Sequence, residues 1–259
     1  MKKINLIIIF LMFFIGFILY NKLPSMIPMH WNIWGQVDNY MPKSKSLWIF
    51  PTVSLIMLVL FKVIPSFDPK KDKYRLFKHE WEIMQSGIII FFAYLYFIIL
   101  YVSLNPGAAI IQLIFIGIGA LFILLGNYLS KIRQNYFIGI KIPWTLSSEN
   151  NWNKTHRYAS WCFVIAGIIT IAESYFIWYA PVVIFASIFL TLALPIIYSF
   201  LLFKKIPEKM KYVYIILFLG ILFILFIRLI SGEDDWICVG GQWVKHGMPS
   251  AQIPTTPCK

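Results

Sequence analysis

The sequence predicts an all-α protein, a bundle of about seven transmembrane helices with its amino terminus inside the cell and its carboxyl terminus outside. Three observations predict this class. The 259 residues have a mean hydropathy of +0.74, and only 13% of them are charged, whereas about 25% are charged in a soluble domain. Seven apolar stretches approach the length of about 20 residues that a spanning helix needs. The basic residues are also distributed unevenly between the connections.

The distribution of basic residues sets the predicted orientation. If Lys2 and Lys3 are cytoplasmic and the spans alternate, seventeen of the 23 Lys and Arg residues lie inside and six lie outside. This agrees with the positive-inside rule, which accounts for most of the net charge of +12 and leaves no reason to invoke a nucleic-acid partner. The predicted spans are residues 4–20, 47–64, 83–102, 108–125, 158–179, 181–203 and 213–230.

The spans and their connections divide the chain into five regions. Short connections, such as Asn105-Pro106-Gly107, favour antiparallel neighbouring helices. The regions are residues 1–64 with the first two spans and an extracytoplasmic loop, 65–107 with a basic cytoplasmic connector and the third span, 108–203 with a long cytoplasmic loop at 126–157, 204–230 with a seventh span, and 231–259, an extracytoplasmic tail.

The connector at 65–82 is rich in lysine and also carries Tyr74, Phe77 and Trp81. A basic segment with interleaved aromatic residues is typical of a helix that lies at the lipid headgroups. The simpler interpretation is a positively charged anchor with no further role.

The tail contains two of the three cysteines. Cys162 lies in the fifth span and is most simply a small buried apolar residue. Cys238 and Cys258 lie outside, in a compartment that permits a disulfide between them. Residues 236–239 and 242–245 flank Gly240-Gly241, a pair typical of a tight β-hairpin turn. A zinc site that adds His246 would lack the four closely spaced ligands of structural zinc, so no metal site is predicted.

The extracytoplasmic loop between the first two spans is a candidate binding site. It is rich in turn-forming residues, and its histidine can change charge near neutral pH while a nearby aspartate orients it. The alternative is that Trp31 and Trp34 belong to an interfacial aromatic belt and that the histidine only pairs locally. The candidate residues are His30, Trp31, Asn32, Gly35, Asp38 and Lys43.

The cytoplasmic loop at 126–157, here called the signature loop, is the main candidate site because ordered polar loops often carry function. We expect it to begin as an extension of the fourth span, to turn at Gly139 and to be extended before Pro143. Ser147 or Ser148 is expected to cap the next helix. The alternative is a basic re-entry loop with interfacial tryptophans. The candidate residues are Asn127, Arg133, Asn135, Gly139, Pro143, Trp144, Thr145, Trp152, Thr155, His156 and Arg157.

Glu173 is the one acidic residue within a predicted span. It lies about 22 Å along the fifth span at 1.5 Å per residue, a depth similar to that of Arg228 in the seventh. Intramembrane charges are functional candidates, so a transporter with Glu173 as its coupling group is one alternative function. A structural ion pair, or Arg228 reaching outward to water, is the other interpretation. A membrane enzyme would have to use His30 with Asp38, and no catalytic motif supports it.

The signature loop resembles a sequence pattern of the SdpI family of bacterial membrane proteins. Lys141 and Ile142 depart from this pattern, which has Arg and Thr in their places. The matching residues are Gly126, Asn127, Tyr128, Leu129, Lys131, Arg133, Asn135, Tyr136, Phe137, Gly139, Ile140, Pro143, Trp144, Thr145, Leu146, Ser148, Trp152, Lys154, Thr155, His156 and Arg157.

The extracytoplasmic loop is similar to a second motif of the same family, which carries Pro24, Ile27, Pro28, His30, Trp31, Asn32, Gly35, Asp38 and Lys43 in this chain. The resemblance spans about residues 1–203 and implies protection of the cell from a secreted membrane-active toxin. It implies contact with membrane lipids, a peptide toxin outside and a repressor-type protein in the cytoplasm, so that immunity is joined to signalling. No catalytic motif in the sequence supports an enzymatic activity, so no enzyme is predicted. The sequence predicts no cofactor.

Overall fold

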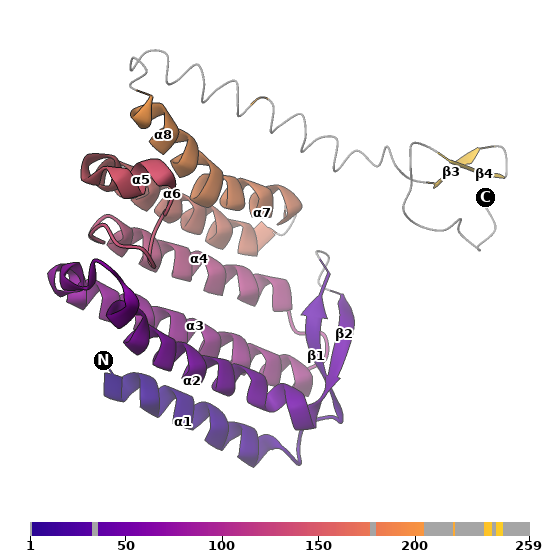
Figure 1. The fold of residues 1–259 in the computed structure, drawn as a ribbon. Helices are drawn as coiled ribbons and strands as arrows, with labels where there is room; N and C mark the ends of the chain where they lie inside the picture. Colours follow the sequence, from indigo (N-terminus) through magenta and orange to yellow (C-terminus); the bar gives the residue numbers. More distant parts are fainter. Residues whose placement is uncertain are drawn as a thin grey trace. The chain divides into compact units, whose positions relative to one another are not determined.

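The computed structural model describes residues 2–32, 36–176, 180–204, 220, 236–239 and 242–245. The chain forms two compact units, Met1–Lys205 and Ile206–Lys259. The first unit contains helices that pack side by side in an antiparallel series (Figure 1). Neighbours in this series are mostly neighbours in sequence, as the short connections predict.

The apolar stretches of the first unit form helices. These are α1 (Lys2–Leu19), α2 (Lys43–Phe67), α3 (Lys78–Leu104), α4 (Ile110–Leu129), α6 (Glu149–Phe176), α7 (Ala180–Ile188) and α8 (Leu194–Phe203). Five helical segments of the described residues are long and apolar enough to cross a membrane, and α1 is a shorter apolar helix. Six of the seven predicted stretches are therefore helical. Of the seventh, at 213–230, the structure describes Gly220 alone, so this prediction is not tested.

Helices α4 and α6 make the most extensive contact in the unit. Glycines allow this contact, because a Cβ added to Gly119 would lie 2.6 Å from the carbonyl oxygen of Gly167, and one added to Gly126 would lie 2.9 Å from that of Ser160. Small residues at such positions let the backbones of membrane helices approach each other closely. The signature loop joins the ends of this closely packed pair.

The last apolar stretch of the unit is not a single regular helix. A short π-helix, η2 (Phe189–Ala193), lies between α7 and α8. Pro195 explains the change, because it has no N–H to donate to the carbonyl of Thr191 four residues earlier. The Thr191 hydroxyl separately donates to the Ser187 carbonyl one turn earlier, at 2.7 Å. Ser187 Oγ in turn lies 2.9 Å from Thr170 Oγ1, which ties α7 to α6.

The loop between α1 and α2 contains an antiparallel hairpin that the sequence did not predict. Strand β1 (Met26–Trp31) pairs with β2 (Val37–Pro42), with irregular register around Met29. Ile27 is fully buried against α1, α2 and α3, and Trp31 packs partly against the end of α3 and the start of α4. The hairpin therefore lies across one end of the bundle.

The second unit contains one described hairpin, in which β3 (Trp236–Val239) pairs with β4 (Gln242–Lys245). This matches the pattern predicted around the glycine pair. Cys258 lies outside the described residues, so the predicted Cys238–Cys258 disulfide stays a prediction. Arg228, Gly35, Trp34 and His246 also lie outside them.

Candidate functional site

The signature loop and the connector lie together at one end of the first unit. This is the end at which α1 begins, and the β1–β2 hairpin lies at the opposite end (Figure 1). The connector contains a 3₁₀-helix, η1 (Lys71–Phe77), and the signature loop contains the short helix α5 (Pro143–Ser147). Two segments that are far apart in sequence thus form one folded surface.

Asp68 joins the connector to the signature loop. Its side chain is 2% exposed, at the point where α2 ends. Oδ2 accepts hydrogen bonds from Tyr74 Oη at 3.0 Å and from the backbone N–H of Tyr136 at 2.9 Å, and Oδ1 accepts from the N–H of Lys70 at 2.7 Å. Three donors satisfy this buried carboxylate, and one of them belongs to the signature loop.

Asn135, a predicted site residue, organises the tight turn that follows α4. Its Oδ1 accepts from the N–H groups of Phe137 and Ile138 at 2.9 and 2.7 Å, and its Nδ2 donates to the carbonyls of Arg133 and Ile138. The Tyr74 hydroxyl also lies 3.3 Å from Oδ1. Asn135 is fully buried, so its amide maintains the fold of the loop and its contact with the connector.

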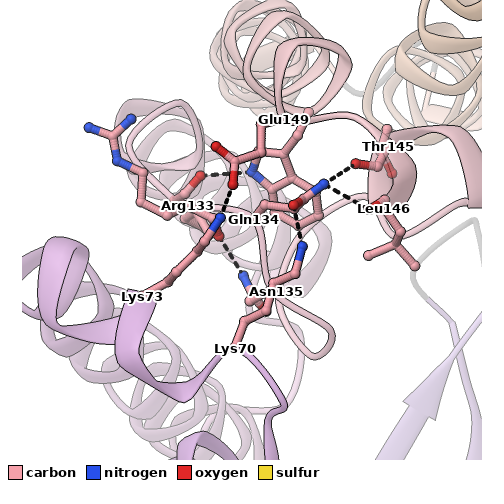
Figure 2. A network of polar contacts seen from close by, with 10 residues as sticks. Lys70, Lys73, Arg133, Gln134, Asn135, Thr145, Leu146 and Glu149 are labelled. Carbon is pink, nitrogen blue, oxygen red and sulfur yellow. Dashed lines mark hydrogen bonds and ion pairs between the residues drawn. The ribbon is translucent and has the colours of Figure 1, made fainter.

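Gln134 and Thr145 hold the two halves of the signature loop together (Figure 2). Gln134 Nε2 donates to the carbonyls of Thr145 and Leu146 at 2.8 and 2.9 Å, while Lys70 Nζ from the connector donates to Gln134 Oε1. Thr145 Oγ1 donates to the Ile140 carbonyl at 2.7 Å and accepts from the N–H of Ile142 at 3.1 Å. Ile142 is extended, as the following Pro143 predicts.

Gly139 lies against His156 of α6. Gly139 has a φ of +105°, and a Cβ there would clash with His156 Nε2. His156 Nε2 accepts from the N–H of Ile140 at 3.0 Å, which leaves Nδ1 to donate to the Trp152 carbonyl at 2.9 Å. These partners assign the neutral Nδ1–H tautomer. The turn predicted at Gly139 is confirmed.

Trp152 and Asn151 fix the start of α6. Trp152 is fully buried, donates from Nε1 to the Ile132 carbonyl at 2.9 Å and stacks on His156. Asn151 Nδ2 donates to the Ser199 carbonyl of α8 at 3.0 Å, and Asn151 Oδ1 accepts from the hydroxyls of Ser199 and Thr155. Ser148 Oγ accepts from the N–H of Asn151 at 3.2 Å, which confirms the predicted cap.

The aromatic residues of the connector face the protein. Tyr74, Phe77 and Trp81 are buried in one core cluster together with Ile132 and Trp152. Of the two interpretations of this connector, the helix with its aromatic residues at the lipid headgroups is wrong, because these side chains pack beneath the signature loop. The simpler interpretation, a positively charged anchor, is not tested. Helix α4 also ends at Leu129, so the expected extension of the fourth span is shorter than predicted.

Several predicted residues of the signature loop remain exposed. Arg133, Pro143 and Arg157 are exposed, and Asn127 donates to the Ile123 carbonyl at 2.8 Å on the surface of α4. Trp144 packs against Phe200 and Phe203 of α8.

Near Arg133, Lys73 of the connector forms an ion pair with Glu149 at the start of α6 (Figure 2). Arg133, Lys73 and Glu149 border a pocket of about 300 Å³ that Leu76, Asn153 and Gln134 also line.

The hairpin at the opposite end brings two predicted residues together. His30 Nδ1 lies 2.5 Å from Asp38 Oδ1, and both side chains are exposed. Asn32 and Gln36 close the tip, since Asn32 Oδ1 accepts from the Gln36 N–H at 3.0 Å. Lys43 has a structural contact, because its Nζ donates to the Tyr20 and Leu23 carbonyls after α1 at 2.8 and 3.0 Å. The exposed His30–Asp38 pair is thus held on a short, well-anchored hairpin.

The structure gives the positions of two other residues named in the sequence analysis, but it does not test a function for either. Glu173 is buried on α6, whereas its proposed partner Arg228 lies outside the described residues. Cys162 is a buried free thiol, as predicted. Within the described part of the chain, no group of three or more His, Cys, Asp or Glu side chains could hold a metal ion.

Sequence reasoning missed the residues that join the site to its surroundings. Asp68, Gln134 and Asn151 are buried and hydrogen-bonded across segments. The sequence alone does not single out Asp68, because the connector also contains the acids Asp72, Glu80 and Glu82, and Lys70 and Lys71 follow Asp68 closely.

Comparison with known proteins gives two family matches and one curated relative. A model of the SdpI/YfhL protein family matches residues 131–199, and a domain of unknown function (DUF1648) matches residues 7–55. The chain is 30% identical over 209 residues to "Immunity protein SdpI" of Bacillus subtilis (strain 168), an alignment that covers 80% of this chain and 98% of that protein. No solved structure matches.

Proposed function

Because this chain belongs to the SdpI/YfhL protein family, we propose that it protects the cell that carries it against a secreted, membrane-active peptide toxin. It is a multi-pass integral protein of the bacterial cell membrane. The observation that carries the proposal is the extent of the likeness, which reaches over nearly the whole length of a protein named for immunity. The direct test is survival of a toxin-sensitive Bacillus host, with and without this protein, during challenge with membrane-active peptides.

The two ends of the first unit support two separate roles, contact with the toxin at one end and contact with a cytoplasmic partner at the other. In the proposed orientation the amino terminus, the connector and the signature loop are cytoplasmic, and the β1–β2 hairpin is outside. A secreted toxin would then meet the hairpin, while the exposed Arg133 and Arg157 face a repressor-type protein inside. This arrangement joins immunity to signalling, because one helical unit carries both surfaces (Figure 1).

The hairpin gives a prediction for protection. We expect His30→Ala and Asp38→Ala each to weaken toxin binding about tenfold, the effect of losing about 1.4 kcal/mol, and therefore to lower survival under toxin challenge. Both side chains are exposed and contact each other, so their loss leaves the helical core intact. Asn39→Ala, an exposed position on the same strand, is the matched control and keeps full protection. Equal protection by all three variants, at equal amounts in the membrane, would assign the hairpin a purely structural role.

The proposed seventh span and outward tail give a prediction for the cysteines. A Cys238–Cys258 disulfide would leave no thiol for a membrane-impermeant maleimide on intact cells until a reductant is added. After reduction, two thiols per chain are expected to react, because Cys162 is buried in α6. Cys258→Ser is expected to expose the Cys238 thiol without reductant. Labelling of both tail cysteines without reductant would contradict the disulfide, and labelling only after lysis would contradict the orientation.

A further inference from the structure

A groove of about 530 Å³ opens between α1, α2 and the connector end of α3. Its volume lies within the range of about 300–1,000 Å³ that is typical of sites for small molecules. Leu6 of α1 and Leu55, Leu58 and Val59 of α2 line its apolar part, with Phe61 and Trp81 beside them. Leu6, Leu55 and Val59 are more than 40% exposed, so the apolar part opens to the surface of the helices that faces lipid.

The other part of the groove is basic. Lys62, Arg75 and Lys78 line it, together with the single acid Glu82. All three basic side chains are exposed, and none of them forms an ion pair among the described residues. Three basic groups and one acid leave a net positive charge beside an apolar channel. A ligand that complements both parts has an anionic head and a hydrocarbon tail.

The position of the groove along the bundle matches the same ligand. From Leu55 to Pro65 the wall of α2 rises about 15 Å at 1.5 Å per residue. Its apolar end lies within a predicted span, and its basic end adjoins the lysine-rich connector. In a bilayer this places the cations at the headgroup level, where they attract anionic lipids, and places the leucines among the acyl chains.

From these observations we propose that the groove is a binding site for an anionic phospholipid, with an acyl chain along Leu55, Leu58 and Val59 and its phosphate at Lys62, Arg75 and Lys78. The site goes beyond protection against a toxin. It also adjoins the signature loop, because Tyr74 lines the groove while its hydroxyl donates to Asp68 and contacts Asn135. A bound acyl chain thus packs against the side chain that holds the connector to the loop.

The test is direct binding by the full chain. Protein delipidated in detergent is titrated with phosphatidylglycerol or phosphatidylcholine, and bound lipid is counted by native mass spectrometry. We expect one phosphatidylglycerol to be retained with at least about tenfold higher affinity than phosphatidylcholine, because the three cations of the groove attract an anionic lipid. Inorganic phosphate and glycerol phosphate distinguish a lipid site from a site for free phosphate, because neither should compete at millimolar concentration.

Substitutions distinguish lipid binding in the groove from general attraction of lipid to basic side chains elsewhere. Arg75→Gln/Lys78→Gln is expected to weaken phosphatidylglycerol binding more than about tenfold, and Leu58→Trp is expected to block the acyl channel while retaining every charge. Lys71→Gln/Lys131→Gln removes two exposed basic residues outside the groove and serves as the control. Equal loss of binding in this control, or unchanged binding in both groove variants, would overturn the proposal.

A second measurement does not depend on the folding of any variant. Phosphatidylglycerol with a photoreactive acyl chain is expected to cross-link peptides from 55–65 and 81–85 of the wild-type chain. Cross-links confined to other lipid-facing helices would overturn the site. The same experiment can detect a competing occupant. If peptides 55–65 and 81–85 escape labelling by lipid and instead cross-link to residues 206–230 of the chain, that segment occupies the groove in place of lipid.

Discussion

Gly139→Ala is expected to destabilise the protein by about 3 kcal/mol, through a left-handed backbone penalty of about 1–2 kcal/mol and the loss of a buried hydrogen bond. The backbone at Gly139 has a φ of +105°, and the new methyl group would meet His156 Nε2. The ring of His156 would have to move away from the N–H of Ile140, and its stacking partner Trp152 would be disturbed. Reversible unfolding in mixed detergent, followed by tryptophan fluorescence, measures the change.

Gly107→Ala is the matched control for this experiment. Gly107 also has a positive φ, +97°, but a Cβ there would meet nothing within 4 Å. Its substitution therefore reports the backbone penalty alone, about 1–2 kcal/mol. The difference between the two variants measures the contact of Gly139 with His156. Equal destabilisation would show that this contact adds nothing to stability.

Asp68→Asn is the second substitution for which we expect a large effect, a loss of about 3 kcal/mol. The buried carboxylate accepts from Tyr74, Tyr136 and Lys70. An amide of the same size keeps one acceptor oxygen but turns an N–H₂ group toward other donors, so at least one buried donor loses its partner. Hydrogen exchange at the Tyr136 amide is expected to quicken together with the loss of stability.

Asp72→Asn provides the comparison for the loss of charge. Asp72 lies in the same connector and is exposed, so its substitution removes an identical charge without removing a buried acceptor. We expect it to change stability by less than about 0.5 kcal/mol. If both variants were destabilised equally, the effect would come from the charge of the connector and the docking role of Asp68 would be rejected.

The helices were predictable because apolar length is a local property of sequence. Six of the seven apolar stretches coincide with helices, and the cap at Ser148 and the turn at Gly139 follow from local chemistry. The β1–β2 hairpin was not predicted. Pro28 lies in its first strand, where it cannot donate to the ladder, and the irregular register breaks the alternation that would have revealed the strands.

The chemistry of the signature loop was harder to predict, because sequence does not show which way a polar side chain points. The predicted site residues Asn135, Thr145, Thr155 and His156 are buried and bonded within the protein. Arg133 and Arg157 are exposed. The motif thus combines residues that build the loop with residues available to a partner. The burial of the connector's aromatic residues was not predictable, because a tertiary partner such as Asn135 for Tyr74 lies some 60 residues further along the chain.

The close contact of α4 with α6 limits how these two helices can move against each other. With Gly119 facing the backbone of Gly167, axial sliding of α4 would bring a residue with a Cβ against a carbonyl oxygen and meet a steric stop. The contacts of the pair with α3 and α8 are less extensive, so we expect α4 and α6 to move as one body. Such a movement would change the inclination of the whole signature loop and leave its internal hydrogen bonds intact.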